Sequence, residues 1–262
     1  MIPAQQVVDL VLDAAAGAET IVLVRDHAEA SLRWAGSSMT TNGVAVRRTT
    51  TVISIVRDGD GAHVGSLETS DVDPAVLPEL VAAARAAARS APPARDAFEL
   101  LTGTGGPDDW DAPVAGTGAE VFGSLATQLA RGFAGPDALY GFAHHTVETT
   151  FLATSTGVRR RWEQPTGSVE INAKRDGASA WAGVSTPWFV EVDAEALLAD
   201  LSTRLGWATN TVELPAGRYE TIMPPSTVSD MMIYLMWTMD GRGAQEGRTA
   251  LSAPGGGTRV GE

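Results

Sequence analysis

The first part of the chain begins with an apolar pattern of helical period. Apolar residues from Val7 to Ala15 recur three and four positions apart, which predicts a helix, and Gly17 is placed to end it. The period then changes to that of strands. An apolar run at residues 20–25 predicts a buried strand, and alternation at residues 30–35 predicts a half-buried one.

A hairpin and a second helix follow. Residues 44–57 are rich in Val, Thr and Ile and predict a long strand, and residues 63–69 predict its return. The intervening segment Asp58-Gly59-Asp60-Gly61 predicts a tight turn, because glycine accepts the positive φ that such turns need. Asp73 is the expected N-cap of the next helix, and Pro74 suits its first turn.

Residues 1–90 are therefore expected to form an N-terminal α+β unit, a helix plus an antiparallel sheet. Residues 91–118 differ, because prolines, glycines and the acidic segment 108–111 interrupt any regular pattern. They predict a linker or a long surface loop. Residues 119–262 are expected to form a second α+β unit, a β-meander with flanking helices.

Within this second unit, the period changes several times. Apolar spacing predicts a helix over residues 119–133, and a period of two predicts strands between residues 139 and 186. Glycine-containing segments predict turns at 155–157, 165–167 and 176–177. The remaining expected elements are a helix capped by Asp193, a strand at residues 218–223 and a helix capped by Ser226.

The composition favours a folded protein of the cytoplasm. Of the 262 residues, 44% are hydrophobic, which is enough for a sizeable core. The absence of cysteine excludes disulfides, thiolate metal sites and a thiol nucleophile. The first residues carry no basic and apolar signal-peptide pattern, and the longest apolar run, Met231–Trp237, falls short of the roughly 20 residues of a membrane span.

The formal net charge of −13 disfavours nucleic-acid binding, because a polyanion is repelled at long range. The basic cluster Arg159-Arg160-Arg161 falls in a predicted strand, where successive side chains alternate between faces. It therefore predicts a solvated edge strand rather than a phosphate site.

The residues that could carry chemistry do not form a recognisable centre. None of the histidines His27, His63, His144 and His145 lies on a predicted helix, so none forms a helical metal-binding motif with a second histidine or a carboxylate. His144 and His145 are expected on opposite faces of a strand, so they cannot chelate one ion together. The loop 103–106 lacks the Gly-Lys-Ser/Thr of a phosphate loop, and no Gly-x-Ser-x-Gly elbow is present. The methionines after Asp230 predict core packing first, and a partner or peptide surface second.

The order of four segments resembles the TldD/PmbA family, whose members were once labelled modulators of DNA gyrase. Residues 31–38 are similar to the family's R-(F/Y)-A-N-(N/S) strand, and residues 151–158 to its N-S-x-G turn. Residues 214–223 are similar to its P-x-G-x-Y-x-V strand, and residues 240–249 to the segment before its C-terminal domain. Each motif is short, so the shared order along the whole chain carries the resemblance.

The resemblance implies a subunit without the catalytic zinc site. TldD-like members carry His-Glu-x-x-x-His on the helix after the third segment, where the histidines hold zinc and the glutamate acts as general base. The corresponding helix here, residues 226–240, contains neither histidine nor glutamate. The chain therefore looks like the TldE/PmbA kind of subunit, with no catalytic residue and no metal of its own, and with zinc on a TldD-like partner.

The implied function is that of the non-catalytic subunit of a heterodimeric zinc metalloprotease. Its implied substrates are unfolded or small peptides, including leader peptides of ribosomally made antibiotics and labile antitoxins. The candidate contacts with the partner or the peptide cleft are Arg242, Gln245, Glu246 and Arg248. The family usually continues into a large β-rich C-terminal domain, which is expected to be missing from residues 1–262.

Two other interpretations remain open at the level of sequence. The chain could be a stand-alone binding or regulatory protein, acting on gyrase or on a toxin–antitoxin pair without a zinc-bearing partner. Its negative charge disfavours direct contact with DNA but permits a basic protein partner. A stand-alone hydrolase would need a site that the sequence does not reveal.

Overall fold

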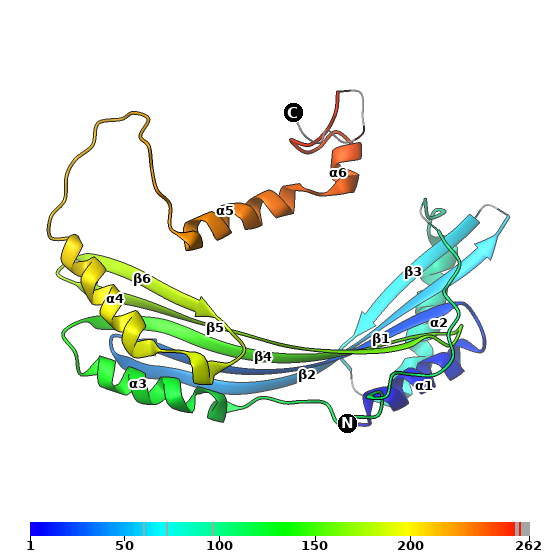
Figure 1. Ribbon diagram of the computed structural model, residues 1–262. Helices are drawn as coiled ribbons and strands as arrows, with labels where there is room; N and C mark the ends of the chain where they lie inside the picture. Colours follow the sequence, from blue (N-terminus) through cyan, green and yellow to red (C-terminus); the bar gives the residue numbers. More distant parts are fainter. Residues whose placement is uncertain (60, 72, 96, 255–256, 258–262) are drawn as a thin grey trace. The chain divides into compact units, whose positions relative to one another are not determined.

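The computed structural model describes residues 1–59, 61–71, 73–95, 97–254 and 257 (Figure 1). They fall into two compact units, Met1–Thr211 and Val212–Glu262.

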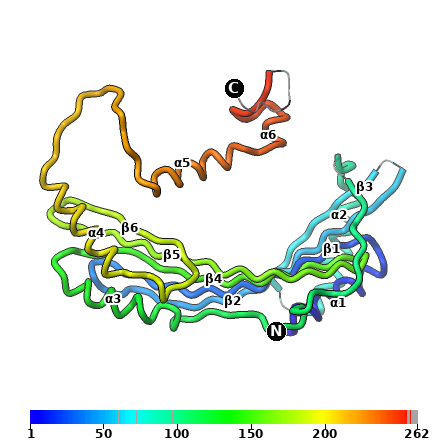
Figure 2. The backbone as a smooth tube through the Cα atoms, in the orientation of Figure 1, coloured from blue at the N-terminus to red at the C-terminus, as the bar shows by residue number. Residues whose placement is uncertain are grey.

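The first unit is built on one six-stranded antiparallel sheet with the order β3-β2-β1-β4-β5-β6. Figure 2 shows that the long strands curve along their length. The strands are β1 Thr20–Ala35, β2 Ser38–Asp58, β3 Gly61–Thr69, β4 Ala138–Thr154, β5 Arg159–Arg175 and β6 Ala178–Ser185.

The central pair of this sheet joins strands that are far apart in the sequence. β1 pairs with β4 from Ile21–Thr154 to Trp34–Gly141. Residues 1–90 and residues from 119 onward, which the pattern assigns to separate units, thus share one sheet. The α+β class is confirmed, as are the meander and its flanking helices.

Helices cover one face of the sheet. α1 and α2 lie at one end, and α3 and α4 lie at the other (Figure 1). Asp73 accepts a hydrogen bond from the amide of Ala75, as expected of a cap, and Asp193 accepts one from Ala196. The helices are α1 Ala4–Ala15, η1 Pro74–Val76, α2 Leu77–Ser90, η2 Ala119–Phe122, α3 Gly123–Phe133, η3 Phe189–Glu191 and α4 Ala194–Trp207.

The helix-covered face carries two apolar clusters, one at each end of β1. Val22 and Val24 pack with α1 and α2, whereas Ala30, Leu32 and Trp34 pack with α3 and α4. Burial of these side chains supplies the main driving force for docking the helices. Alternate residues of β1 face away from these helices, so the helices of the first unit leave the opposite side of the sheet open.

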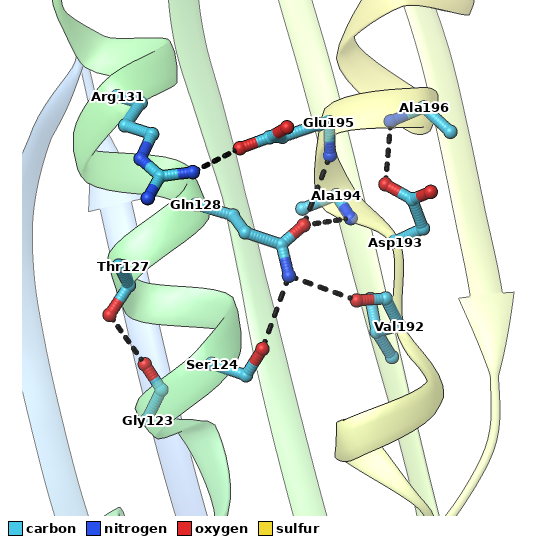
Figure 3. Close-up of polar contacts among 10 residues, drawn as sticks. All are labelled: Gly123, Ser124, Thr127, Gln128, Arg131, Val192, Asp193, Ala194, Glu195 and Ala196. Carbon is cyan, nitrogen blue, oxygen red and sulfur yellow. Dashed lines mark hydrogen bonds and ion pairs between the residues drawn. The ribbon is translucent and has the colours of Figure 1, made fainter.

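The side chain of Gln128 joins α3 to the start of α4 (Figure 3). Its Oε1 accepts hydrogen bonds from the amides of Ala194 and Glu195, at 2.7 and 3.2 Å, and its Nε2 donates to the carbonyl of Val192 at 3.3 Å. These amides belong to the first turn of α4, where no helical carbonyl is available to them. Gln128 therefore acts as a cap supplied by a neighbouring helix.

The segment 91–118 has no helix among its described residues, yet much of it is held against the sheet. We call residues 101–117 the strap. In the strap, Trp110 packs edge-on against Phe151, with ring centroids 5.4 Å apart, and the Gln5 side chain donates to the Trp110 carbonyl at 2.7 Å. Near its start, the amide of Gly103 donates to the carbonyl of Thr156 at 3.1 Å. The strap thereby covers the sheet between the two pairs of helices.

One expected turn of the first unit is absent. Pro165-Thr166-Gly167 does not break the meander but lies inside β5, where Val147 pairs with Pro165. β6 pairs only with residues 168–175 of β5, so Pro165 stands at a sheet edge. A proline is tolerated there, because its missing amide hydrogen costs no ladder bond on the open side.

The second unit contains α5 Pro225–Thr238 and α6 Gly241–Gln245. The strand expected at residues 218–223 is not formed: these residues are exposed and pair with no strand among the described residues. A strand depends on neighbours, so a β-like pattern alone does not fix it. Ser226 is not the cap of α5, which begins one residue earlier after Pro224.

The methionines of α5 are not packed in a core. Met231, Met232 and Met236 are all exposed, and no residue of this helix is buried. No helix in the described part of the chain is both long and apolar enough to cross a membrane.

Candidate functional site

The open face of the sheet is the strongest candidate for a functional surface in the first unit. It is formed by the β1 and β4 side chains that point away from the helices, together with their neighbours on β2, β5 and β6. Among the β1 residues, Arg25, His27, Glu29 and Arg33 belong to it. A face of this kind, which carries charged side chains, suits recognition of a polar or mixed ligand rather than burial in a core.

His27 lies at the centre of a polar cluster on this face. Arg47 on β2 donates to His27 Nε2 at 2.9 Å, and Glu29 Oε2 lies 3.5 Å from the same atom. On the other side, Glu148 Oε2 of β4 is 3.7 Å from His27 Nδ1. A guanidinium can only donate, so Nε2 is the acceptor in the contact with Arg47. The cluster thus offers both a guanidinium and carboxylates to a bound polar group.

Aromatic and polar side chains alternate farther along the open face. Phe142 stacks on His144 with ring centroids 6.0 Å apart, and Ser168 lies 3.2 Å from His144 Nδ1. At the next position, Trp181 donates from its indole nitrogen to Glu170 at 3.3 Å. Side chains with an apolar body and a polar end can contact both the backbone and the side chains of a polypeptide.

Sequence reasoning placed His144 and His145 correctly on a strand, but it left His27 between two predicted strands and missed its cluster. His27 and Glu29 are two positions apart, so a strand puts them on one face, and that signal was available. Arg47 and Glu148 join them only through the pairing of β1 with β2 and β4, which the sequence does not state.

His144 and His145 do point to opposite faces, as expected. His145 is buried under the helix-covered side, where its Nδ1 lies 2.6 Å from Thr117 Oγ1 and its ring packs edge-on against Phe189. Burial lowers the pKa of His145 below the ordinary value of 6.5, because the charged ring would lose its hydration.

The arginines at 159–161 alternate as expected, but they do not form a solvated edge. Only Arg160 is exposed. Arg161 is buried beside Asp109 of the strap and Glu163, at 3.0 and 2.8 Å. The guanidinium of Arg159 lies 5.7 Å from the ring centre of Trp110. The expectation failed because the strap covers one face of the strand, and loop placement is not encoded in strand periodicity.

The predicted contact residues 242–248 lie in the second unit. Asp240 caps α6 by accepting from the amides of Arg242 and Gly243. Glu246 accepts from Arg242 at 2.9 Å and from Arg248 at 2.7 and 2.9 Å, and these hydrogen bonds, that from Arg242 first, lower the pKa of the Glu246 carboxyl. Gln245 is exposed beside them. The structure therefore brings three of the four residues into one charged cluster, and their contact role stays a prediction.

Among the described residues, no group of three His, Asp or Glu side chains is arranged to hold a metal ion. Helix α5 contains neither histidine nor glutamate.

Comparisons with known proteins show which solved structures share the fold of this chain. No family model matches the sequence, and no curated protein does either. Among solved structures, TldE from Thermococcus kodakarensis superposes with a TM-score of 0.59 at 12% identity, over 78% of this chain and 48% of TldE.

Two further structures are similar over nearly the whole chain. A proposed modulator of DNA gyrase from Thermotoga maritima gives a TM-score of 0.69 at 14% identity, over 96% of this chain and 59% of that one. A corresponding protein from Bacteroides thetaiotaomicron gives 0.69 at 13%, over 94% and 60%.

These matches show that the chain has the fold of TldE and of the two gyrase-modulator proteins. The resemblance to the TldD/PmbA family is thus confirmed at the level of the fold. The chain spans about half to three fifths of the length of these structures.

Proposed function

We propose that this chain is a TldE/PmbA-type, non-catalytic subunit of a heteromeric zinc metalloprotease that acts on unfolded or small peptides. The observation that carries the proposal is the fold shared with TldE, combined with a helix α5 that lacks histidine and glutamate. A TldD-like partner would supply the zinc, two histidine ligands and the general base. This chain would complete the enclosure around the peptide.

The open face of the sheet is consistent with such a role. It combines a guanidinium, carboxylates and aromatic rings, as expected of a surface that binds and orients a polypeptide. The cluster Arg242–Glu246–Arg248 is the proposed partner or cleft contact in the second unit.

The test is native mass spectrometry of this chain co-expressed with a TldD-like subunit from the same source. We expect a mixed complex that carries zinc on the TldD-like subunit. The complex should cleave a short unstructured peptide and lose this activity when zinc is chelated. Co-expression with an unrelated zinc protease controls for nonspecific association.

Two separate species would contradict the proposal and favour a binding or regulatory protein that acts alone. A zinc ion found on this chain in the absence of the partner would contradict it in a different way, since the metal is assigned to the other subunit.

A further inference from the structure

One stretch of β2 lies at the edge of the sheet with no strand beside it. β2 pairs with β1 along residues 38–54, but β3 begins to pair only at Thr50. Residues 41–49 therefore have β1 on one side and no strand on the other among the described residues. We call this stretch the β2 edge (Figure 1). Alternate backbone amides and carbonyls along such an edge have no ladder partner.

The other edges of the sheet are each protected. At β3, the amide of Ala94 donates to the carbonyl of Ala62, and His63 forms a bridge with Pro93. At β6, the carbonyl of Trp181 accepts from Arg204 at 3.1 Å. The N-terminal half of β5 contains Pro165. Soluble proteins use such devices to prevent pairing with another strand.

Residues 41–47 of the β2 edge have none of these devices, and only Arg48 near its end points a charge inward, where it pairs with Asp26. The edge contains no proline, lysine or acidic residue, and its register with β1 is regular from Thr41 to Thr49, since the one shift falls between Arg33 and Trp34. On the helix side of the edge, Val44 and Val46 are 53% and 67% exposed. A long, regular edge with exposed apolar side chains is suited to accept an added strand.

The charges beside this edge favour an acidic ligand. Arg47 projects from the edge itself onto the open face, and Arg25 and Arg33 of the adjacent β1 lie on the same face. Both β1 arginines are exposed, and neither forms an ion pair with a described residue. The three arginines outnumber the two carboxylates of this part of the face, Glu29 and Glu148, which is a local departure in a chain of net charge −13 and attracts negative groups.

We propose that the β2 edge binds an extended peptide segment by backbone pairing, with acidic side chains on the open face and apolar side chains beside Val44 and Val46. The alternation follows from the strand period, which places neighbouring side chains of the added strand on opposite faces. This inference goes beyond the proposed function, because it gives this chain its own peptide site and ligand class without requiring a zinc-bearing partner.

The test measures fluorescence anisotropy of labelled peptides with the full 262-residue chain. The probe is an acetylated peptide of about nine residues that alternates valine and glutamate, the length of strand that the edge can pair. One comparison peptide replaces glutamate with lysine, and a second carries N-methyl groups on alternate amides. We expect the lysine peptide to bind at least about tenfold more weakly, and the N-methylated peptide to lose binding because it cannot complete the ladder.

Two charge-reversal variants locate the site. Arg47→Glu should weaken binding of the glutamate peptide by about tenfold or more and improve binding of the lysine peptide. Arg160→Glu makes the same change of charge at an exposed position on β5 and should leave both affinities unchanged. Circular dichroism checks that both variants remain folded.

Equal affinities for the glutamate and lysine peptides, full binding of the N-methylated peptide, or equal effects of the two variants would overturn the proposal. Light scattering provides a further check. If the chain forms a dimer that Arg47→Glu dissociates but that the glutamate peptide leaves intact, the β2 edge pairs with a second copy of the chain instead. Because all measurements use this chain alone, they are independent of complex formation with a TldD-like subunit.

Discussion

Arg48 on β2 and Asp26 on β1 form a bidentate ion pair in the gap between the two apolar clusters. Arg48 Nε and Nη2 lie 2.6 Å from Asp26 Oδ1 and Oδ2, and the two side chains are only 7% and 12% exposed. Arg48 Nη1 also donates to the carbonyl of Ile2, just before α1. The pair therefore ties the two central strands to the N-terminal segment where apolar packing is interrupted.

Removal of one partner should destabilise the first unit strongly. We expect Asp26→Ala to lower the free energy of unfolding by about 3–5 kcal/mol, because it leaves the buried Arg48 guanidinium without a counter-charge. Urea denaturation followed by circular dichroism measures the change. The double variant Asp26→Leu with Arg48→Met should lower the free energy of unfolding by clearly less than Asp26→Ala does. An equal or larger decrease would show that the unpaired Arg48 charge is not the source of the effect.

The buried ring of His145 makes stability depend on pH. Burial lowers its pKa from 6.5, so the unfolded chain binds more protons than the folded chain as the pH falls below that value. The His145 contribution to stability is therefore fully present above pH 6.5 and declines as the pH falls toward the lowered folded-state pKa. Urea denaturation between about pH 5 and 8 should show that the free energy of unfolding decreases as the pH falls, and His145→Gln should weaken this dependence on pH. An unchanged slope in the variant would assign the dependence to other groups.

The Gln128 cap should stabilise the joint between α3 and α4. Gln128→Ala leaves the first amides of α4 without their acceptor and should lower the free energy of unfolding by about 1–3 kcal/mol. Thr127→Ala is the matched control, because the Thr127 hydroxyl bonds only to the carbonyl of Gly123 within its own helix (Figure 3). Equal decreases in the free energy of unfolding of the two variants would contradict this capping role of Gln128.

Trp110 should hold the strap on the sheet. Trp110→Ala removes the contact with Phe151 and the ring beside the Arg159 guanidinium, and we expect limited proteolysis within residues 101–117 to accelerate about tenfold. Phe98→Ala serves as control, since that ring is 85% exposed. Cleavage at the wild-type rate would mean that the backbone contacts alone secure the strap.

Local patterns predicted most elements of the first unit because short-range physics sets them. The helix caps Asp73 and Asp193 and the turn at Asp176-Gly177 follow from side-chain and backbone geometry within a few residues. The turn predicted at Pro165–Gly167 is absent for a nonlocal reason, because the short β6 leaves that part of β5 at a sheet edge. The same limit applies to residues 218–223, whose strand pattern has no partner among the described residues.

The sequence by itself determined the α+β class, the approximate positions of the helices of the first unit, the opposite orientations of His144 and His145, and the lack of a zinc motif on α5. These properties depend on periodicity, chirality and residue type, which act over a few positions. Only the tertiary structure decided that β1 and β4 join both halves in one sheet and that His27 meets Arg47 and Glu148. It also decided that the β2 edge has β1 on one side and, within the described part of the chain, no strand on the other. Strand pairing and register arise from contacts between distant residues, and no local pattern specifies which partner a strand will find.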